Sequence, residues 1–174
     1  MAILALMTAV AAAAGPAPDF PAPIGQAADG KAHCYSPDIV RKTCASLANY
    51  SRNAAGDIVG ETTVVLGKSP IVTMSTASAM TVEGGRLCST LRKADLEAAK
   101  FTVDGAAPDD ARAVQLHNAV SDQFSPIVDH QVCVSYEPDG SGFMAHTSFD
   151  GLPRPSLDQR VIWVTPADGW KVTP

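Results

Sequence analysis

The sequence predicts an α+β fold: an antiparallel β-sheet of hairpins, with one main helix at about residues 108–125 packed on one face, stapled by two disulfides. Three observations predict it. Extended segments flank a turn between residues 130 and 151, apolar residues recur at helical spacing between residues 113 and 124, and the chain contains four cysteines.

The hairpin pattern covers residues 130–151, where two extended segments flank the turn sequence Pro138-Asp139-Gly140-Ser141-Gly142. Asp-Gly pairs favour the positive φ angles that tight hairpins need. Cys133 lies in the first segment, so a disulfide is expected to fix this hairpin to an earlier part of the chain.

The main helix is expected to begin at Pro108, a residue that suits the first helical position, with two aspartates at the positive end of the helix. Ala113, Leu116, Val120 and Phe124 form one apolar stripe, and Pro126 ends the helix. His117 lies beside the stripe, where we expect a packed or rim histidine.

The remaining segments alternate between short extended runs and turns. We expect strands at 44–52 and 58–66 paired antiparallel, separate short strands at 70–76 and 80–82, a hairpin at 83–88 and a strand at 100–103. We expect a short turn or one turn of helix at 38–43 and a short helix at 92–99. The strand at 160–165 is the most apolar, and residues 170–172 are expected to return alongside it.

Length and composition fit one domain with a core of aliphatic residues. Of 174 residues, 46% are hydrophobic and 6% aromatic, and the net charge is −5. An acidic surface repels a phosphate backbone, so we expect no nucleic-acid partner.

The first residues resemble an export signal. Residues 2–14 are apolar apart from Thr8 and end in three alanines, a pattern that suits signal peptidase, although no basic residue precedes them. The sequence predicts a signal peptide at 1–14, a flexible Pro/Ala-rich linker at 15–32 and a single α+β domain at 33–174. The expected location is the periplasm or outside the cell, with no membrane span in the mature chain and a monomeric state.

Four cysteines behind an export signal favour two structural disulfides. Proximity favours the pairs Cys34–Cys44 and Cys88–Cys133 among the three possible connectivities. The alternative is a metal site that uses His33 or His130, but no closely spaced Cys-x-x-Cys pair is present. We therefore predict no metal and no cofactor.

Some segments resemble small uncharacterised exported bacterial proteins. They are Cys34 with Cys44-Ala-Ser, Val82-Glu-Gly-Gly, and the run from Leu157 to Gly169. The resemblance covers most of residues 33–173 and implies no particular reaction, ligand or site residue.

No catalytic motif of a common hydrolase or metalloprotease occurs in the sequence, so we assign no catalytic residue. A Ser–His–acid triad stays open, because such triads are defined by geometry, and His33, His130 and His146 are available. His130 and His146 flank the hairpin and are expected to lie near each other.

The favoured interpretation is a non-enzymatic binding, inhibitory or envelope-associated protein with an unknown protein or envelope ligand. The alternative is a small periplasmic hydrolase with a histidine in its site. A pocket that holds a histidine, a carboxylate and a nucleophile favours the hydrolase, whereas a flat surface with an exposed Trp163 or Trp170 favours the binding protein.

Overall fold

The computed structural model describes residues 19–174 and is mostly β. The predicted α+β sheet is wrong, because the sheet does not stay open with a helix on one face: eight antiparallel strands close into a barrel, and one long helix accompanies it. The expected signal peptide lies outside the described residues.

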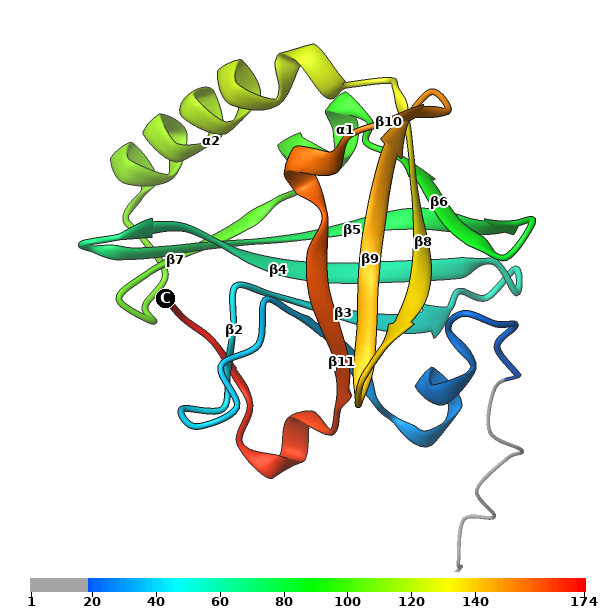
Figure 1. Cartoon of the computed structure of the whole chain (residues 1–174). Helices are drawn as coiled ribbons and strands as arrows, with labels where there is room; N and C mark the ends of the chain where they lie inside the picture. The colour runs from blue at the N-terminus through cyan, green and yellow to red at the C-terminus, as the bar shows by residue number, and fades with distance from the viewer. Residues whose placement is uncertain (1–18) are drawn as a thin grey trace, which may run out of the picture.

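The eight barrel strands follow one another around the barrel in chain order, each antiparallel to the next (Figure 1). They are β1 (Ala32–Tyr35), β3 (Ser46–Arg52), β4 (Ile58–Lys68), β5 (Ile71–Glu83), β6 (Arg86–Thr90), β8 (Gln131–Asp139), β9 (Gly142–Phe149) and β11 (Gln159–Val164). The last strand returns to the first, with Ala32 opposite Val164 and Tyr35 opposite Val161. Closure removes the free edges at which an open sheet can pair with other chains.

The hairpins expected from turn residues are present. β8 and β9 pair from Val132–Phe149 to Asp139–Gly142, and β5 turns into β6 through Gly84-Gly85. The two short strands expected at 70–76 and 80–82 are instead one long strand, β5. Of the two possibilities expected at 38–43, a short turn or one turn of helix, the structure has the turn, closed by a β-bridge between Asp38 and Thr43.

An insertion between β6 and β8 contains α1 (Lys93–Glu97), β7 (Lys100–Val103), α2 (Asp110–Phe124) and the 3-10 turn η2 (Ser125–Ile127). α2 begins two residues later than expected, and the Asp109 carboxylate accepts a hydrogen bond from the Arg112 amide at 2.8 Å. The apolar stripe packs as expected: Leu116 and Val120 join Phe101 and Met74 in one buried cluster.

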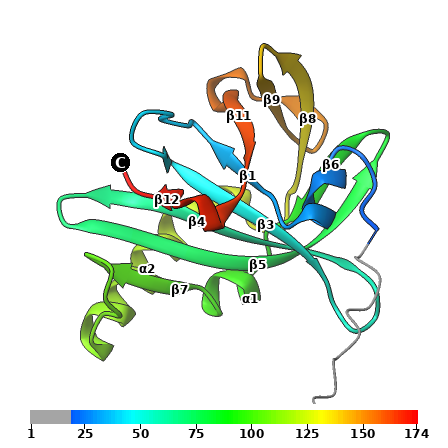
Figure 2. The ribbon, with the colours of Figure 1, turned by 90° about the horizontal axis from the view of Figure 1, so that it is seen from below.

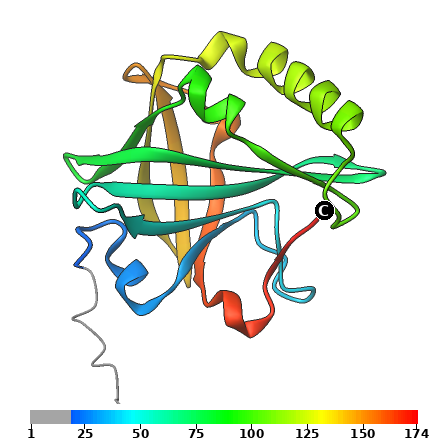
Figure 3. The same cartoon turned by 180° about the vertical axis from the view of Figure 1, so that it is seen from behind.

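α2 does not cover a face of an open sheet. It runs along one side of the barrel, and the long β4–β5 hairpin passes beneath it (Figure 3). Viewed from below, α1, α2 and β7 lie on one side of the molecule and β8, β9 and β11 on the other (Figure 2). The end of the insertion thereby reaches an opening of the barrel.

The N-terminal segment packs against the barrel at its opposite end. The segment expected to be a flexible linker forms the 3-10 helix η1 (Gly25–Asp29), and Phe20 and Ile24 are buried. They contact residues such as Ala48 and Leu87 in the barrel core. The described part of the expected linker is therefore part of the folded domain, because its apolar side chains plug the barrel.

Both disulfides favoured by proximity are present. Cys34–Cys44 joins β1 to β2 (Thr43–Cys44), within a small buried cluster that includes Ile162 and Val164. The C-terminal strand β12 (Lys171–Val172) pairs parallel with β2, so it does not return beside β11 as expected. Cys88–Cys133 joins β6 to β8 at directly opposed positions and thus ties the base of the insertion.

Three short elements complete the chain: β10 (Leu152–Pro153), which pairs with β9, and the 3-10 turns η3 (Pro155–Leu157) and η4 (Pro166–Asp168). Among residues 19–174, no helix is long and apolar enough to cross a membrane.

Candidate ligand site

The barrel encloses a cavity of about 390 Å³. Every one of the eight barrel strands contributes to its wall, from Tyr35 on β1 to Gln159 on β11. An eight-stranded barrel is just wide enough either to be filled by its own side chains or to hold one small ligand. In this barrel the side chains leave a hollow of that kind unfilled.

The hollow exists because several inward positions carry short side chains. Ser46 and Ala48 on β3, Thr62 on β4 and Ser89 on β6 line the cavity. Inward positions of a strand are two residues apart, so Ser46, Ala48 and Tyr50 lie along one wall, two small side chains followed by a large one. The short side chains of Ser46 and Ala48 leave the cavity unfilled along this wall, and the ring of Tyr50 bounds it.

The mouth of the cavity is apolar. Phe124 and Ile127 reach it from the end of the insertion, and Leu157 reaches it from η3. Leu157 is 44% exposed and Leu152, on the adjacent β10, is 63% exposed. The cavity therefore opens between two segments that are not barrel strands.

The far end of the cavity is closed by an aromatic cluster, which we call the tyrosine floor. It consists of all three tyrosines of the chain, Tyr35, Tyr50 and Tyr136. The hydroxyl oxygens of Tyr35 and Tyr136 lie 2.7 Å apart. The Tyr50 hydroxyl lies 2.8 Å from Nδ1 of His33, which is itself 1% exposed.

His33 is held behind the floor by further rings. Its ring centroid lies 3.8 Å from that of Trp163 and 4.8 Å from that of Tyr136. Tyr50 contacts the apolar plug formed by Phe20 and Ile24. The floor is thus built from β1, β3 and β8, with His33 on β1 and Trp163 on β11 behind it and the N-terminal segment packed against Tyr50.

The groups at this end of the cavity are uncharged at neutral pH. Burial lowers the pKa of the His33 imidazole to about 3. Burial also raises the pKa of Tyr35, Tyr50 and Tyr136 above the ordinary value of a phenol. None of the described side chains that line the cavity is an acid or a base of the Asp, Glu, Lys, Arg or His type.

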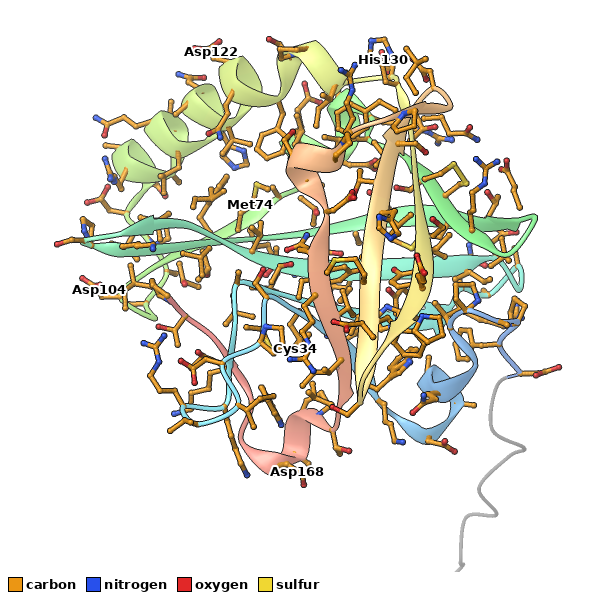
Figure 4. All side chains as sticks on the ribbon, in the orientation of Figure 1. Cys34, Met74, Asp104, Asp122, His130 and Asp168 are labelled. Carbon is orange, nitrogen blue, oxygen red and sulfur yellow. A yellow bond between two sulfur atoms is a disulfide. The ribbon has the colours of Figure 1, made fainter. Side chains whose placement is uncertain are left out.

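The other two candidate histidines lie outside the cavity and apart from each other. His130 bonds Asp150, and it lies at the rim of the molecule near β10 (Figure 4). His146 bonds Asp158 through Nδ1 at 2.7 Å, and it pairs in register with Ser135. Ser135 is five residues beyond His130, roughly 17 Å along an extended strand, so the expectation that the two histidines meet is wrong.

Three groups in these two pairs have shifted pKa values. The hydrogen bond to Asp158 raises the pKa of His146, with a smaller effect from Glu137, and the His146 ring lowers the pKa of Asp158. The hydrogen bond to His130 likewise lowers the pKa of Asp150. In the described part of the chain no histidine hydrogen-bonds a serine or threonine hydroxyl.

The two tryptophans do not form an exposed platform. Trp163 stacks on His33 at the tyrosine floor, and Trp170 packs against the cluster around the Cys34–Cys44 disulfide. His117 packs edge-on against Phe101, as expected for a packed or rim histidine. The sequence therefore named His33 and Trp163, but not their place at the end of a cavity.

Comparison of the chain with protein-family profiles, curated proteins and solved structures finds no match. The site must therefore be interpreted from its own chemistry. Within residues 19–174, no group of three or more histidine, cysteine, aspartate or glutamate side chains is placed to hold a metal ion.

A second hollow lies on the outer wall beside β5 and β6 and is smaller, about 200 Å³. Its polar groups already bond one another: Glu83 accepts from Thr81 at 2.7 Å and from Gln131 at 3.3 Å. Because these groups bond one another and the hollow has only about half the volume of the barrel cavity, it is a weaker candidate for a ligand site.

Sequence reasoning missed the three tyrosines and the short residues of the wall. The tyrosines lie up to 101 positions apart along the chain, and only barrel closure brings them together. A signal was present in Ser46, Ala48 and Tyr50, whose alternate spacing places them on one face of a strand.

Proposed function

We propose that this protein is an exported binding protein that holds one small, mainly apolar ligand inside its barrel. The observation that carries the proposal is the uncharged cavity of about 390 Å³ bounded by all eight strands. Ligand sites are typically concave, mostly apolar and roughly 300–1,000 Å³ in volume, with a few polar groups that orient the ligand.

The hydrolase alternative has no comparable support. Its expected combination of histidine, carboxylate and nucleophile does not occur in the cavity, which none of these histidines or carboxylates lines, and His33 behind the floor bonds a tyrosine. The histidines that bond carboxylates, His130 and His146, are more than 40% exposed. A binding role, by contrast, requires only the residues that already line the cavity.

Export is supported by the apolar leader pattern at residues 2–14 and by the two disulfides, which persist in oxidising compartments. Non-reducing mass spectrometry of the protein from its native host tests this part. We expect a chain that lacks the leader and has no free thiol, and four free thiols would contradict export.

The binding proposal is tested with N-phenyl-1-naphthylamine, a neutral dye whose fluorescence rises in apolar surroundings. We expect the purified protein to bind it with one-to-one stoichiometry. Thr62→Phe should abolish binding, because the new ring fills the space beside Ser46 and Ala48.

Asn49→Phe is the matched control, since Asn49 lies on the neighbouring strand with its side chain exposed. It adds the same ring outside the barrel and should leave dye binding unchanged. Thr62→Phe should unfold no more easily than the wild type, because the ring enters existing space. Equal dye binding by both variants would contradict a site in the lumen.

A further inference from the structure

The tyrosine floor offers hydrogen bonds but no charge to a bound molecule. Tyr35, Tyr50 and Tyr136 line the cavity, and their raised pKa values keep all three phenols protonated at neutral pH. His33 behind them stays neutral as well. A ligand group at this end therefore meets hydroxyl groups alone.

The hydroxyl protons are not all committed. The Tyr35–Tyr136 contact uses one hydroxyl proton, and the contact between Tyr50 and His33 uses either the Tyr50 hydroxyl proton or the Nδ1 proton of His33, according to the tautomer of the imidazole. The remaining hydroxyl proton of the Tyr35–Tyr136 pair can turn to Tyr50 or to an oxygen atom of a ligand, because a phenol O–H rotates. Each phenol oxygen can also accept, so the floor suits a donor or an acceptor.

An ionised head group has no partner here. No lysine or arginine is among the side chains that line the cavity, and the nearest imidazole resists protonation. A carboxylate that left water for this site would lose its hydration without gaining an opposite charge, which is costly. A neutral hydroxyl or carbonyl group loses far less hydration free energy on leaving water, and it forms new hydrogen bonds with the phenols.

We propose that the ligand is an uncharged amphiphile: a hydroxyl, ketone or ester oxygen rests on the tyrosine floor, and an apolar body extends to Phe124, Ile127 and Leu157 at the mouth. This inference rests on the proposed function, since it assigns the chemical class of the ligand that the lumen holds. It also states that the lumen discriminates against fatty carboxylates of the same length.

The test uses three ten-carbon molecules of similar size: 1-decanol, 2-decanone and decanoate. Each competes with N-phenyl-1-naphthylamine for the full-length mature protein at pH 7.5, where decanoate is ionised. We expect 1-decanol and 2-decanone to displace the dye at least about tenfold more effectively than decanoate. Decanoate binding as tightly as the alcohol would overturn the assignment.

The hydroxyls are then removed one at a time with Tyr35→Phe and Tyr136→Phe, which keep the rings. Each change should weaken 1-decanol about three- to tenfold, the usual range for one hydrogen bond, and leave dye affinity within about twofold. Asn49→Phe, whose side chain lies outside the barrel, is the control and should leave the ratio of decanol to decanoate affinity unchanged.

The outcomes separate the two proposals. If the dye binds but neither the alcohol nor the ketone is preferred over decanoate, the head-group assignment fails and the lumen remains a binding site. If both phenylalanine variants keep the full preference, the tyrosine floor is not its source. If the wild-type protein binds no dye and none of the three molecules, the proposed function itself fails.

Discussion

His33 shows how a single residue can be both part of a site and a determinant of stability. It is enclosed by Tyr50, Tyr136 and Trp163, and its one hydrogen bond goes to a phenol. No carboxylate is hydrogen-bonded to it, in contrast to His130 and His146. Burial alone therefore sets its ionisation, and the protonated imidazole is incompatible with the folded state.

We predict that acidification below pH 6.5 destabilises the protein through His33. The pKa of His33 falls from 6.5 to about 3 in the folded state, so in this range the unfolded chain binds a proton that the folded chain does not. Stability therefore rises with pH up to 6.5 and decreases on acidification, by up to about 1.4 kcal/mol per pH unit. Urea unfolding at pH 6.5 and pH 5.0 measures the slope.

Two variants separate this effect from other titrating groups. His33→Asn keeps an amide near the position of Nδ1, and it should flatten the slope even though it lowers stability at both pH values. His146→Gln should keep the slope, because the raised pKa of His146 gives stability below pH 6.5 that decreases at higher pH. An unchanged slope in His33→Asn would refute the assignment.

At the scale of elements, the insertion between β6 and β8 acts as one unit. It leaves the barrel after Thr90 and returns at Gln131, and its last residues Phe124 and Ile127 reach the cavity mouth. The Cys88–Cys133 disulfide joins the strands on both sides of it. The Cys88–Cys133 disulfide thus fixes the base of the insertion, whose last residues narrow the mouth of the cavity.

We predict that replacing both Cys88 and Cys133 by serine loosens this insertion. The disulfide closes a loop of 45 residues, and its loss should lower the free energy of unfolding by about 4 kcal/mol in the chain-entropy account. Amide hydrogen exchange should accelerate most in residues 93–127. Urea unfolding and hydrogen exchange followed by mass spectrometry measure the two effects.

The Cys34→Ser/Cys44→Ser variant is the comparison. Its loop spans 10 residues, so a smaller loss of about 3 kcal/mol is expected. Its faster exchange should concentrate near β2 and β12, which lie beside that disulfide. The same exchange pattern in both double variants would contradict a specific role for Cys88–Cys133 at the insertion.

Elements that depend on neighbouring residues were predictable from the sequence, whereas their long-range pairing was not. The β8–β9 hairpin follows from its Asp-Gly turn, and α2 follows from its apolar stripe. β5 was divided in two because residues 77–79 are Ala-Ser-Ala, without the β-branched or aromatic residues typical of strands. Its continuity comes from β4, which pairs with it along nearly its full length.

At the scale of the whole molecule, closure decides both the fold and the site. The predicted open sheet and the observed barrel share most of their strands and differ chiefly in how these connect, above all where β1 meets β11. Those partners are more than 120 residues apart, and no local pattern specifies their register. The cavity and the tyrosine floor exist only after closure, so a sequence analysis that predicts an open sheet cannot place them.

The N-terminal plug is the second feature of the whole molecule, because it packs against the barrel on the side away from the insertion (Figures 1 and 3). Ile24 is 0% exposed and packs with Phe20 against the barrel core.

We predict that Ile24→Ala lowers the free energy of unfolding by about 2–5 kcal/mol, since it removes buried methyl groups and leaves a void. Urea unfolding measures the loss. Val40→Ala, at a side chain that is 95% exposed, should change stability by less than about 0.5 kcal/mol. A loss in Ile24→Ala as small as that of Val40→Ala would mean that the plug is a detachable segment, and the barrel would then have to be stable without it.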